Sequence, residues 1–280
     1  MTNNPALPFE DRLVLVVGGS KGIGKETAKQ IARLGGSVCI VARELEVLTQ
    51  AAAEVRVAAV STDQLIEVIA ADATDREDLA PKLIAFVEEH GLPDFLINAV
   101  GYAYPNYLSN FTLEDYEENM RVNYYGQLVP TLVLLPLFRE RGSGHISFIS
   151  SMMGFMGMVG YGTYAPSKFA IVGLAETLRH ELKPENIGVS LLYPPDTDTP
   201  GFERENQTKP PETEILSESA KLYQPDAVAK VYVKGLLRGR FYIMIGSGKW
   251  IWLLFRLFPW LVHKIMDMDY HKARRQVMHN

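Results

Sequence analysis

Residues 13–36, LVLVVGGSKGIGKETAKQIARLGG, decide the fold of this 280-residue chain. The apolar run 13–17 predicts a buried parallel strand, and the segment after the glycines predicts an amphipathic helix. Gly18, Gly22 and Gly24 stand between them in a Gly-x-x-x-Gly-x-Gly pattern. Glycines let the backbone turn tightly and approach a pyrophosphate, whose charge the start of a helix attracts. The stretch therefore predicts a dinucleotide-binding strand–turn–helix unit, with a plain glycine-rich turn as the alternative.

The end of the next predicted strand, 37–41, distinguishes the two nicotinamide dinucleotides. NAD sites place an acid at this position, where it binds the ribose 2′-hydroxyl. Here the chain has Ala42 followed by Arg43, and a guanidinium forks onto a phosphate with paired hydrogen bonds. Lys21 can reach the same phosphate. These residues favour NADP(H) over NAD, against the alternative that Arg43 is an ordinary surface arginine.

A second stretch, SMMGFMGMVGYGTYAPSK at 151–168, carries the expected chemistry. Tyr164 and Lys168 are four residues apart, so they lie on one face of a helix. A nearby cation favours phenolate, and we therefore expect Lys168 to lower the pKa of Tyr164 towards neutrality. Ser151 ends the preceding strand and can hydrogen-bond a substrate oxygen. The three side chains suit the interconversion of a ketone and an alcohol, whereas a solvated helix face is the alternative.

The rest of the pattern predicts an α/β fold, a Rossmann-type doubly wound sheet of seven mainly parallel strands flanked by helices. Further strands are expected at 65–70, 95–98, 145–150, 188–192 and 241–245, and helices at 44–59, from 75, and at 112–141, 162–183 and 225–237. Asp72 can bind an adenine amino group or cap the helix that begins near Asp75. Asn123 predicts a kink or a water site in its helix, unless it is a surface residue.

Composition narrows the class of protein. A length of 280 residues suits one large α/β core, and the net charge of −5 argues against nucleic-acid binding. The single cysteine, Cys39, cannot form a disulfide within the chain, which fits a reducing compartment. The N-terminal stretch 1–12 lacks the apolar core of a signal peptide. We also expect no metal site.

Two segments lie outside the regular pattern. The polar, proline-rich stretch 193–222 is expected to be a lid or binding loop, with Thr197 and Thr199 at the ligand crevice. Residues 249–266, KWIWLLFRLFPWLVHKIM, are too short and too interrupted by charges to span a bilayer, and Pro259 should kink them. They fit a segment lying in a membrane interface, with a dimer-interface or substrate-pocket helix nearly as good an explanation. We therefore expect a single domain at 1–248 and a C-terminal extension at 249–280.

With both motifs in place, residues 11–245 resemble a short-chain dehydrogenase/reductase. The resemblance implies that Tyr164 is the proton donor and that Lys168 lowers its pKa and holds the nicotinamide ribose. It also implies that Ser151 positions the carbonyl and that Asn123 holds a relay water. Members of this family commonly pair through the two long helices, so a homodimer or homotetramer is implied.

The resemblance also implies a set of cofactor contacts. Asp72 and Asn98 match positions that contact adenine and stabilise the central sheet, and Thr197 and Thr199 match contacts to the carboxamide and pyrophosphate. The complete implied set is Gly18, Ser20, Lys21, Gly22, Ile23, Gly24, Arg43, Asp72, Ala73, Asn98, Gly101, Tyr164, Lys168, Thr197 and Thr199.

A narrower resemblance is carried by PPDTDTPGF at 194–202, which is similar to the 3-ketodihydrosphingosine reductases. It implies NADPH-dependent reduction of a long-chain lipid ketone in sphingolipid synthesis, by a cytoplasmic protein that touches the cytosolic face of a membrane through its C-terminal segment. Four methionines at 152, 153, 156 and 158 can line an apolar channel or simply pack in the core. Glu203 and Glu205 can attract the ammonium of such a lipid, or are merely solvated.

Two other functions stay open at this point. One is a ketoreductase of the same family for a steroid, retinoid or 3-oxoacyl lipid. The other is a non-catalytic NADPH-binding membrane adaptor, against which the joint presence of Asn123, Ser151, Tyr164 and Lys168 argues, because an adaptor usually loses a reacting group.

Overall fold

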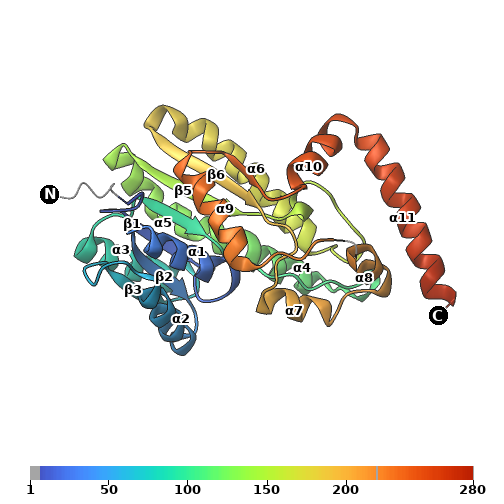
Figure 1. Cartoon of the computed structure of the whole chain (residues 1–280), viewed down its shortest axis with the longest axis horizontal. Coiled ribbons are helices and arrows are strands. Elements are labelled where there is room, and N and C mark those ends of the chain that lie inside the picture. Colours follow the sequence, from blue (N-terminus) through green and yellow to red (C-terminus); the bar gives the residue numbers. More distant parts are fainter. Residues whose placement is uncertain (1–6, 219, 280) are drawn as a thin grey trace.

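Seven parallel strands form the centre of the computed structural model, which describes residues 7–218 and 220–279 (Figure 1). Residues 1–6, part of the stretch in which no signal peptide is expected, lie outside the described residues. The strands are β1 (Leu13–Val17), β2 (Ser37–Ala42), β3 (Ile66–Ala70), β4 (Phe95–Asn98), β5 (Gly144–Ile149), β6 (Ile187–Tyr193) and β7 (Tyr242–Met244). The predicted seven-stranded doubly wound sheet is confirmed.

The strand order is β3-β2-β1-β4-β5-β6-β7, and it reverses at β1. The chain moves outward from β1 to β3 and then returns to pair β4 with the other side of β1. Val17 aligns with Val41 on one neighbour and with Asn98 on the other, so the three strands end level with one another. In such sheets ligands bind outside the carboxyl ends of the strands where the order reverses.

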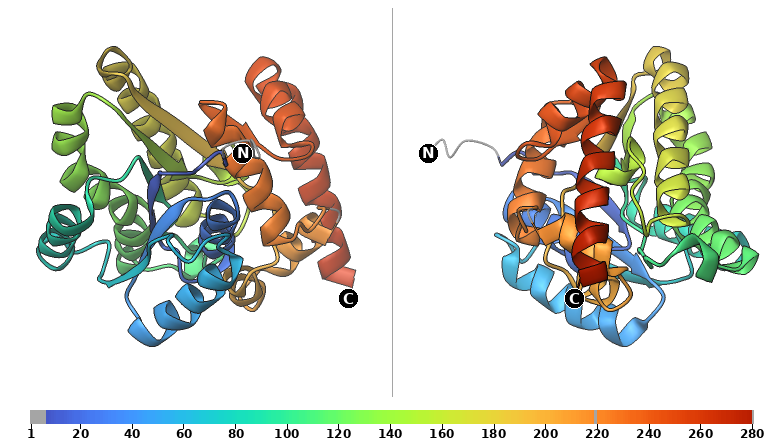
Figure 2. Two further views of the ribbon diagram at one scale, coloured as in Figure 1. Left: turned by 60° about the vertical axis from the view of Figure 1, so that its left-hand side comes forward. Right: turned by 90° about the vertical axis from the view of Figure 1, so that its right-hand side faces the viewer.

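Helices cover both faces of the sheet (Figures 1 and 2). One face packs against α1 (Gly22–Arg33), α2 (Leu45–Ala58) and α9 (Pro225–Leu237), and the other against α3 (Arg76–His90), α5 (Gly126–Arg141) and α6 (Tyr164–Leu182). Ile31 and Tyr232 on the first face, and Phe138 and Ile171 on the second, are 0% exposed. Burying a side chain of this size stabilises the fold by roughly 1.5–3 kcal/mol.

The helix predicted at 112–141 is present but interrupted. It consists of α4 (Leu113–Met120), a π-helical turn at Arg121–Tyr125 and α5. Thr112 and Asp115 form a capping box at its start. Asn123 lies in the π turn, so the predicted local departure from α-helix is confirmed, and its burial rules out the alternative of a surface asparagine.

The prediction of a continuous loop at 193–222 is wrong. Two short helices, α7 (Pro200–Asn206) and α8 (Pro211–Glu218), occupy much of it. Both begin at a proline, which suits the first helical position because the missing N–H has no partner there anyway. Thr199 caps α7 by accepting a hydrogen bond from the Phe202 N–H at 3.1 Å. The prolines therefore mark helix starts rather than loop.

The C-terminal segment forms α10 (Gly248–Leu257) and α11 (Pro259–His279), which meet at Phe258 (Figures 1 and 2). Pro259 starts the second helix, so the predicted kink is a complete break. Phe255 contacts Phe155 with ring centroids 6.1 Å apart, and α11 packs along α8 through the buried Ala273. Among residues 7–218 and 220–279, no helix has the length and apolarity needed to cross a bilayer.

Candidate active site

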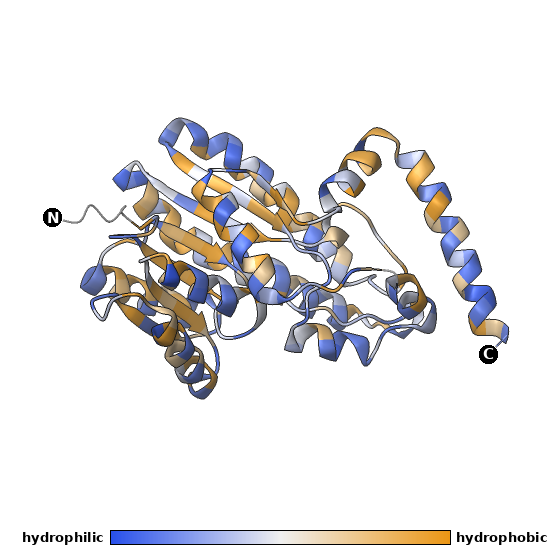
Figure 3. Ribbon diagram, in the orientation of Figure 1, coloured by the Kyte–Doolittle hydropathy of each residue, from blue (hydrophilic) through white to orange (hydrophobic). Residues whose placement is uncertain are grey.

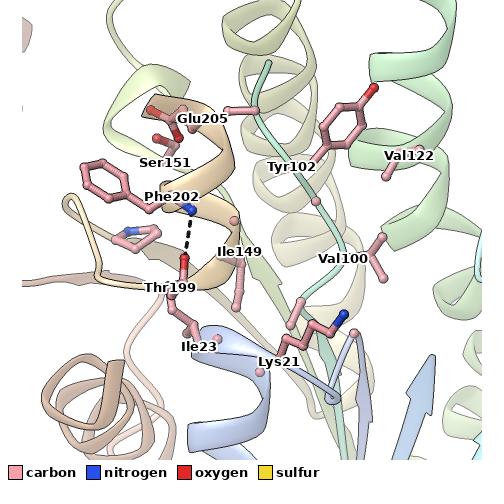
Figure 4. A pocket seen from close by; sticks show the side chains of 18 of the residues that line it. Lys21, Ile23, Val100, Tyr102, Val122, Ile149, Ser151, Thr199, Phe202 and Glu205 are labelled. Carbon is pink, nitrogen blue, oxygen red and sulfur yellow. Dashed lines mark hydrogen bonds between the residues drawn. The ribbon is translucent and has the colours of Figure 1, made fainter. Parts of the chain in front are cut away.

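A cavity of about 690 Å³ lies at the carboxyl ends of the strands (Figure 4). Its walls come from the loops after β1 to β6 and from α7. Every residue of the implied cofactor set except Asn98 lines it. Of the four expected catalytic residues, Ser151, Tyr164 and Lys168 also line it. The structure thus brings the glycine loop and the reactive side chains into one space.

The backbone of the glycine loop after β1 leaves no room for a side chain at two of its positions. Gly18 has φ +85°, and a Cβ there would lie 2.7 Å from the Ala99 carbonyl carbon. A Cβ on Gly24 would lie 2.3 Å from the Gly18 oxygen. Because both positions exclude side chains, the loop keeps its N–H groups and the start of α1 bare towards the cavity. This cradle fits the pyrophosphate of a nicotinamide dinucleotide.

The residues expected at the two sides of the dinucleotide lie around this cradle. Lys21 and Arg43 are exposed on the cavity wall, and Ser20 and Ile23, which also line the cavity, are half-buried. Thr199 lies against the glycine loop, since a Cβ on Gly22 would be 3.1 Å from its Cγ2. Thr197 also lines the cavity, although its hydroxyl donates to the Pro195 carbonyl at 2.7 Å.

Asp72 and Ala73 follow β3 on the cavity wall. The Asp72 carboxylate accepts hydrogen bonds from the backbone N–H and the hydroxyl of Thr74, both at 2.8 Å. It does not cap α3, because Asp75 accepts from the first N–H groups of that helix. The capping alternative for Asp72 is therefore wrong, and its carboxylate remains on the wall of the cavity.

Asn98 lies beneath the cavity rather than on its wall. It is 0% exposed, and its amide donates to the Thr131 hydroxyl at 3.0 Å. No described residue donates a hydrogen bond to its Oδ1. These contacts give it a structural position in the centre of the sheet. Gly101 does line the cavity, where a Cβ would lie 2.8 Å from the Lys168 ammonium.

The reactive side chains converge at the ends of β5 and α6. Ser151 is extended at the strand end, accepts a hydrogen bond from the Met153 N–H at 3.1 Å and lines the same cavity as Tyr164. Lys168 lies one turn further along α6, and its ammonium donates to the Ile149 carbonyl at 3.1 Å. A serine hydroxyl and a phenol on one cavity wall can address the same carbonyl oxygen.

The predicted lowering of the Tyr164 pKa is wrong for the protein alone. Burial raises the pKa of Tyr164, and the carboxylates of Glu205 and Asp196 act in the same direction. Burial also lowers the pKa of Lys168 to about 7, because no carboxylate stabilises its charge. The ammonium lies 5.5 Å from the centroid of the tyrosine ring. Desolvation therefore outweighs the attraction that the spacing predicts.

Asn123 lies behind the reactive pair and not on the cavity wall. Its Oδ1 accepts from the Tyr102 N–H at 2.8 Å, and its Nδ2 lies 2.9 Å from the Ser167 hydroxyl. These contacts tie the loop after β4 to the helix that carries Tyr164 and Lys168. Asn123 lies in the π turn, and its side chain is fully buried.

Sequence reasoning missed a polar group on the substrate side of the cavity. Tyr161, Asp196 and Glu205 line the cavity, and Lys209 contacts Glu205. The sequence predicts Glu205 only as one of two acids in a loop, and it does not predict its contacts with Tyr161 and Lys209. Only helix α7, which the sequence did not predict, turns Glu205 inwards and leaves Glu203 exposed.

The chain is similar to proteins of known class. Residues 12–210 match the family model of the short chain dehydrogenases. The 3-dehydrosphinganine reductase of Danio rerio is 41% identical over 81% of this chain and 69% of its own, and the 3-ketodihydrosphingosine reductase of Dictyostelium discoideum is 40% identical over 82% and 73%. A solved short-chain dehydrogenase from Sphingobium yanoikuyae, in complex with NADPH, superposes with a TM-score of 0.74 at 25% identity over 96% of both chains. The chain belongs to the short-chain dehydrogenase family.

Proposed function

We propose that this protein uses NADPH to reduce the ketone of 3-ketodihydrosphingosine to the alcohol of dihydrosphingosine. The observation that carries the proposal is the meeting of Ser151, Tyr164 and Lys168 with the glycine cradle in one cavity. The relatives named as 3-ketodihydrosphingosine and 3-dehydrosphinganine reductases supply the substrate class.

NADPH, when bound, supplies the hydride. Tyr164 donates a proton to the ketone oxygen, and Ser151 donates a hydrogen bond to that oxygen and so orients it. Lys168, whose ammonium is held at the end of β5 beside Gly101, holds the ribose hydroxyls of the bound cofactor. Asn123 positions the water that returns a proton to the Tyr164 phenolate. The place of each side chain on or directly behind the cavity wall supports its role.

The choice of NADPH rests on the charge around the cradle. Lys21 and Arg43 are both exposed on the cavity wall next to the glycine loop. No acid follows β2 at Ala42, where an NAD-binding site places one. Lys21 and Arg43 suit the 2′-phosphate, and Glu44, which also lines the cavity, still leaves one positive charge in excess.

An apolar path leads from the reactive groups to the C-terminal extension, residues 249–280. Met152, Met153 and Met158 line the cavity. Met152 also borders the start of α10, since a Cβ on Gly248 would lie 3.3 Å from its sulfur. Methionine side chains adapt to flexible apolar ligands, so this wall suits an acyl chain. The arrangement also supports the substrate-pocket interpretation of α10.

The extension supports peripheral contact with a membrane by a cytoplasmic protein. Large apolar side chains are exposed along α10 and at the start of α11, including Trp250 at 68%, Leu257 at 59% and Trp260 at 67%. The ribbon of both helices carries hydrophobic stretches (Figure 3). Residues 249–280 carry six basic and two acidic side chains, whereas the whole chain has a net charge of −5. Apolar side chains flanked by lysine and arginine suit an anionic lipid interface. A lipid ketone dissolved in that interface would then lie close to Met152.

Pairing of two or four copies is proposed through α4–α5 and α6. Leu132 and Phe169 on these helices are each 45% exposed. Such apolar side chains on neighbouring long helices suit an interface between copies of the chain.

The test is turnover of 3-ketodihydrosphingosine by the purified protein with NADPH, with the product identified by mass spectrometry. A steroid ketone, a retinal and a 3-oxoacyl thioester serve as comparison substrates. We expect kcat/KM to be highest for the sphingoid ketone. Preference for one of the comparison substrates would assign the alternative reductase function. Binding of NADPH without turnover of any ketone would assign the adaptor function.

A further inference from the structure

Two carboxylates face the substrate side of the cavity. Glu205, on α7, accepts a hydrogen bond from the Tyr161 hydroxyl at 2.5 Å and lies 3.2 Å from the Lys209 ammonium. Asp196 follows β6, and its backbone carbonyl accepts from the Tyr223 N–H at 2.9 Å. Among residues 7–218 and 220–279, no side chain or backbone group donates to the Asp196 carboxylate. Both acids line the cavity, and Glu205 is drawn there with Ser151 (Figure 4).

This group carries one more negative than positive charge. Lys209 is the cation that acts on both acids, and its side chain is only 3% exposed. It is held towards Glu205 and lies 4.4 Å from the centroid of the Phe202 ring. Burial raises the pKa of both Asp196 and Glu205, which shows that the wall does not fully compensate two carboxylates. A cationic ligand would supply the missing charge.

The position of the acids relative to the reactive groups is a second, independent observation. The Tyr161 and Tyr164 ring centroids are 5.9 Å apart, so the hydroxyl that holds Glu205 belongs to the neighbour of the proton donor. The charges that act on Tyr164 are those of Glu205 and Asp196. A cation bound between these acids and the phenol would therefore be attached close to the carbonyl that Tyr164 protonates.

We propose that Asp196 and Glu205 form an ammonium subsite that selects ketones with a protonated amine on the carbon next to the carbonyl. The proposal rests on the proposed function and deepens it, because 3-ketodihydrosphingosine has its amine at that carbon. Asp196 is the principal partner, since its carboxylate is unpaired in the described chain, while Glu205 is already held by Tyr161 and Lys209. The bound ammonium also neutralises the charge beside Tyr164, which eases the formation of phenolate during proton transfer.

The subsite distinguishes substrates of similar length and polarity. Steroid, retinoid and 3-oxoacyl ketones have no amine beside the carbonyl and would leave the Asp196 carboxylate without a partner, while Glu205 keeps Tyr161 and Lys209. An unpaired buried charge opposes binding, so the same two acids attract the amino ketone and disfavour the neutral ketones.

The experiment compares Asp196→Asn with the parent protein on 3-ketodihydrosphingosine and on its analogue without the amine, both with NADPH. Loss of one hydrogen bond between charged groups should raise KM for the amino ketone about ten-fold or more. KM for the analogue without the amine should stay unchanged or fall. Glu203→Gln is the control, because Glu203 lies on the same helix but is exposed to solvent. Glu205→Gln should act in the same direction as Asp196→Asn.

A binding measurement separates this proposal from the proposed function. Sphinganine, which is the product dihydrosphingosine and keeps the amine but lacks the ketone, is titrated into the NADPH complex of each protein, where no hydride acceptor is present, and its affinity should fall about ten-fold in Asp196→Asn. Equal changes for the amino ketone and its analogue, with unchanged sphinganine affinity, would overturn the ammonium subsite. A parent protein that binds NADPH but reduces neither ketone would overturn the proposed function instead, while the sphinganine titration would still report on the subsite.

Discussion

The ammonium of Lys168 lies 5.5 Å from the centroid of the Tyr164 ring and donates to the carbonyl of Ile149 at 3.1 Å. The lysine is thus anchored to the end of β5 while it faces the aromatic ring. Lys168 is only 3% exposed, and its ammonium lies beside Gly101 on the cavity wall. This geometry separates two roles, because the phenol faces Ser151 while the ammonium is placed for the cofactor.

Removing the phenol hydroxyl should stop the chemistry. Tyr164→Phe keeps the ring and its packing but removes the proton donor, so kcat should fall by roughly 10²–10⁴-fold. The dissociation constant of NADPH should change little, since the ring and Lys168 remain. Stopped-flow reduction and fluorescence titration measure the two quantities. Turnover near the parent rate would show that another group protonates the ketone.

Lys168 should lower the free energy of unfolding of the protein, although ketone reduction requires it. Burial lowers its pKa to about 7, well below the value of 10.5 for an unfolded lysine, so the folded state binds fewer protons than the unfolded state between these two values of pH. The buried ammonium therefore lowers the free energy of unfolding most at or below pH 7, and this loss disappears as the pH rises towards 10.5. Lys168→Met should therefore raise the free energy of unfolding at pH 7 by about 1–3 kcal/mol while abolishing reduction.

The control for this variant is Lys230→Met, at a lysine whose side chain is 58% exposed. Urea unfolding at pH 7 and pH 10 measures all three proteins. A stability gain for Lys168→Met that is the same at both values of pH would mean that added apolar packing, and not the buried charge, is its cause.

Cofactor preference should depend on Arg43. Arg43→Ala removes a paired donor to the 2′-phosphate, and a hydrogen bond to a charged group is worth about 1.5–3 kcal/mol, so NADPH affinity should fall roughly ten-fold or more. NADH affinity should stay the same because NADH lacks this phosphate. Arg238→Ala, at an exposed arginine away from the cavity, serves as the control. Equal losses for both cofactors would indicate a structural role for Arg43.

Acid should destabilise the protein through His145. Burial lowers the pKa of His145 to about 4, and its Nε2 lies 2.7 Å from the Ser190 hydroxyl, which itself donates to the Arg240 carbonyl. Because the folded pKa lies below the unfolded value near 6.5, this contribution to stability is present above pH 6.5 and is lost as pH falls towards 4. The loss amounts to about 3 kcal/mol.

His145→Gln keeps a donor for the Ser190 hydroxyl but does not titrate. The difference in unfolding free energy between the parent and this variant should therefore shrink between pH 7 and pH 4.5. Denaturant unfolding at several values of pH measures it. Parallel curves for the two proteins would assign the acid sensitivity to other groups.

The exposed tryptophans should control lipid binding. Trp250→Ser with Trp260→Ser removes two side chains that are 68% and 67% exposed, so folding should be preserved. Each large apolar side chain buried in a lipid interface contributes roughly 1.5–3 kcal/mol, and the double variant should stay in solution when anionic liposomes are pelleted. Leu45→Ser with Val57→Ser, at positions 59% and 88% exposed on α2, is the matched control. If the parent protein also stays in solution at low salt, the membrane contact is wrong.

The sequence by itself determined the sheet, the glycine cradle and the reactive pair. These features can be read from short stretches of sequence: apolar runs between turns, a glycine pattern between strand and helix, and a four-residue spacing on one helix. Such patterns are local, so they survive without knowledge of what packs around them.

Only the tertiary structure decided the electrostatics and the substrate side of the cavity. The pKa values of Tyr164 and Lys168 follow from burial, which depends on elements far apart in the chain. Asp196 and Glu205 meet because β6 and α7 converge beside Tyr161, and α7 starts at a proline that resembles a loop signal. Spacing fixes which side chains share a helix face, whereas desolvation and long-range contacts determine what charge they carry there.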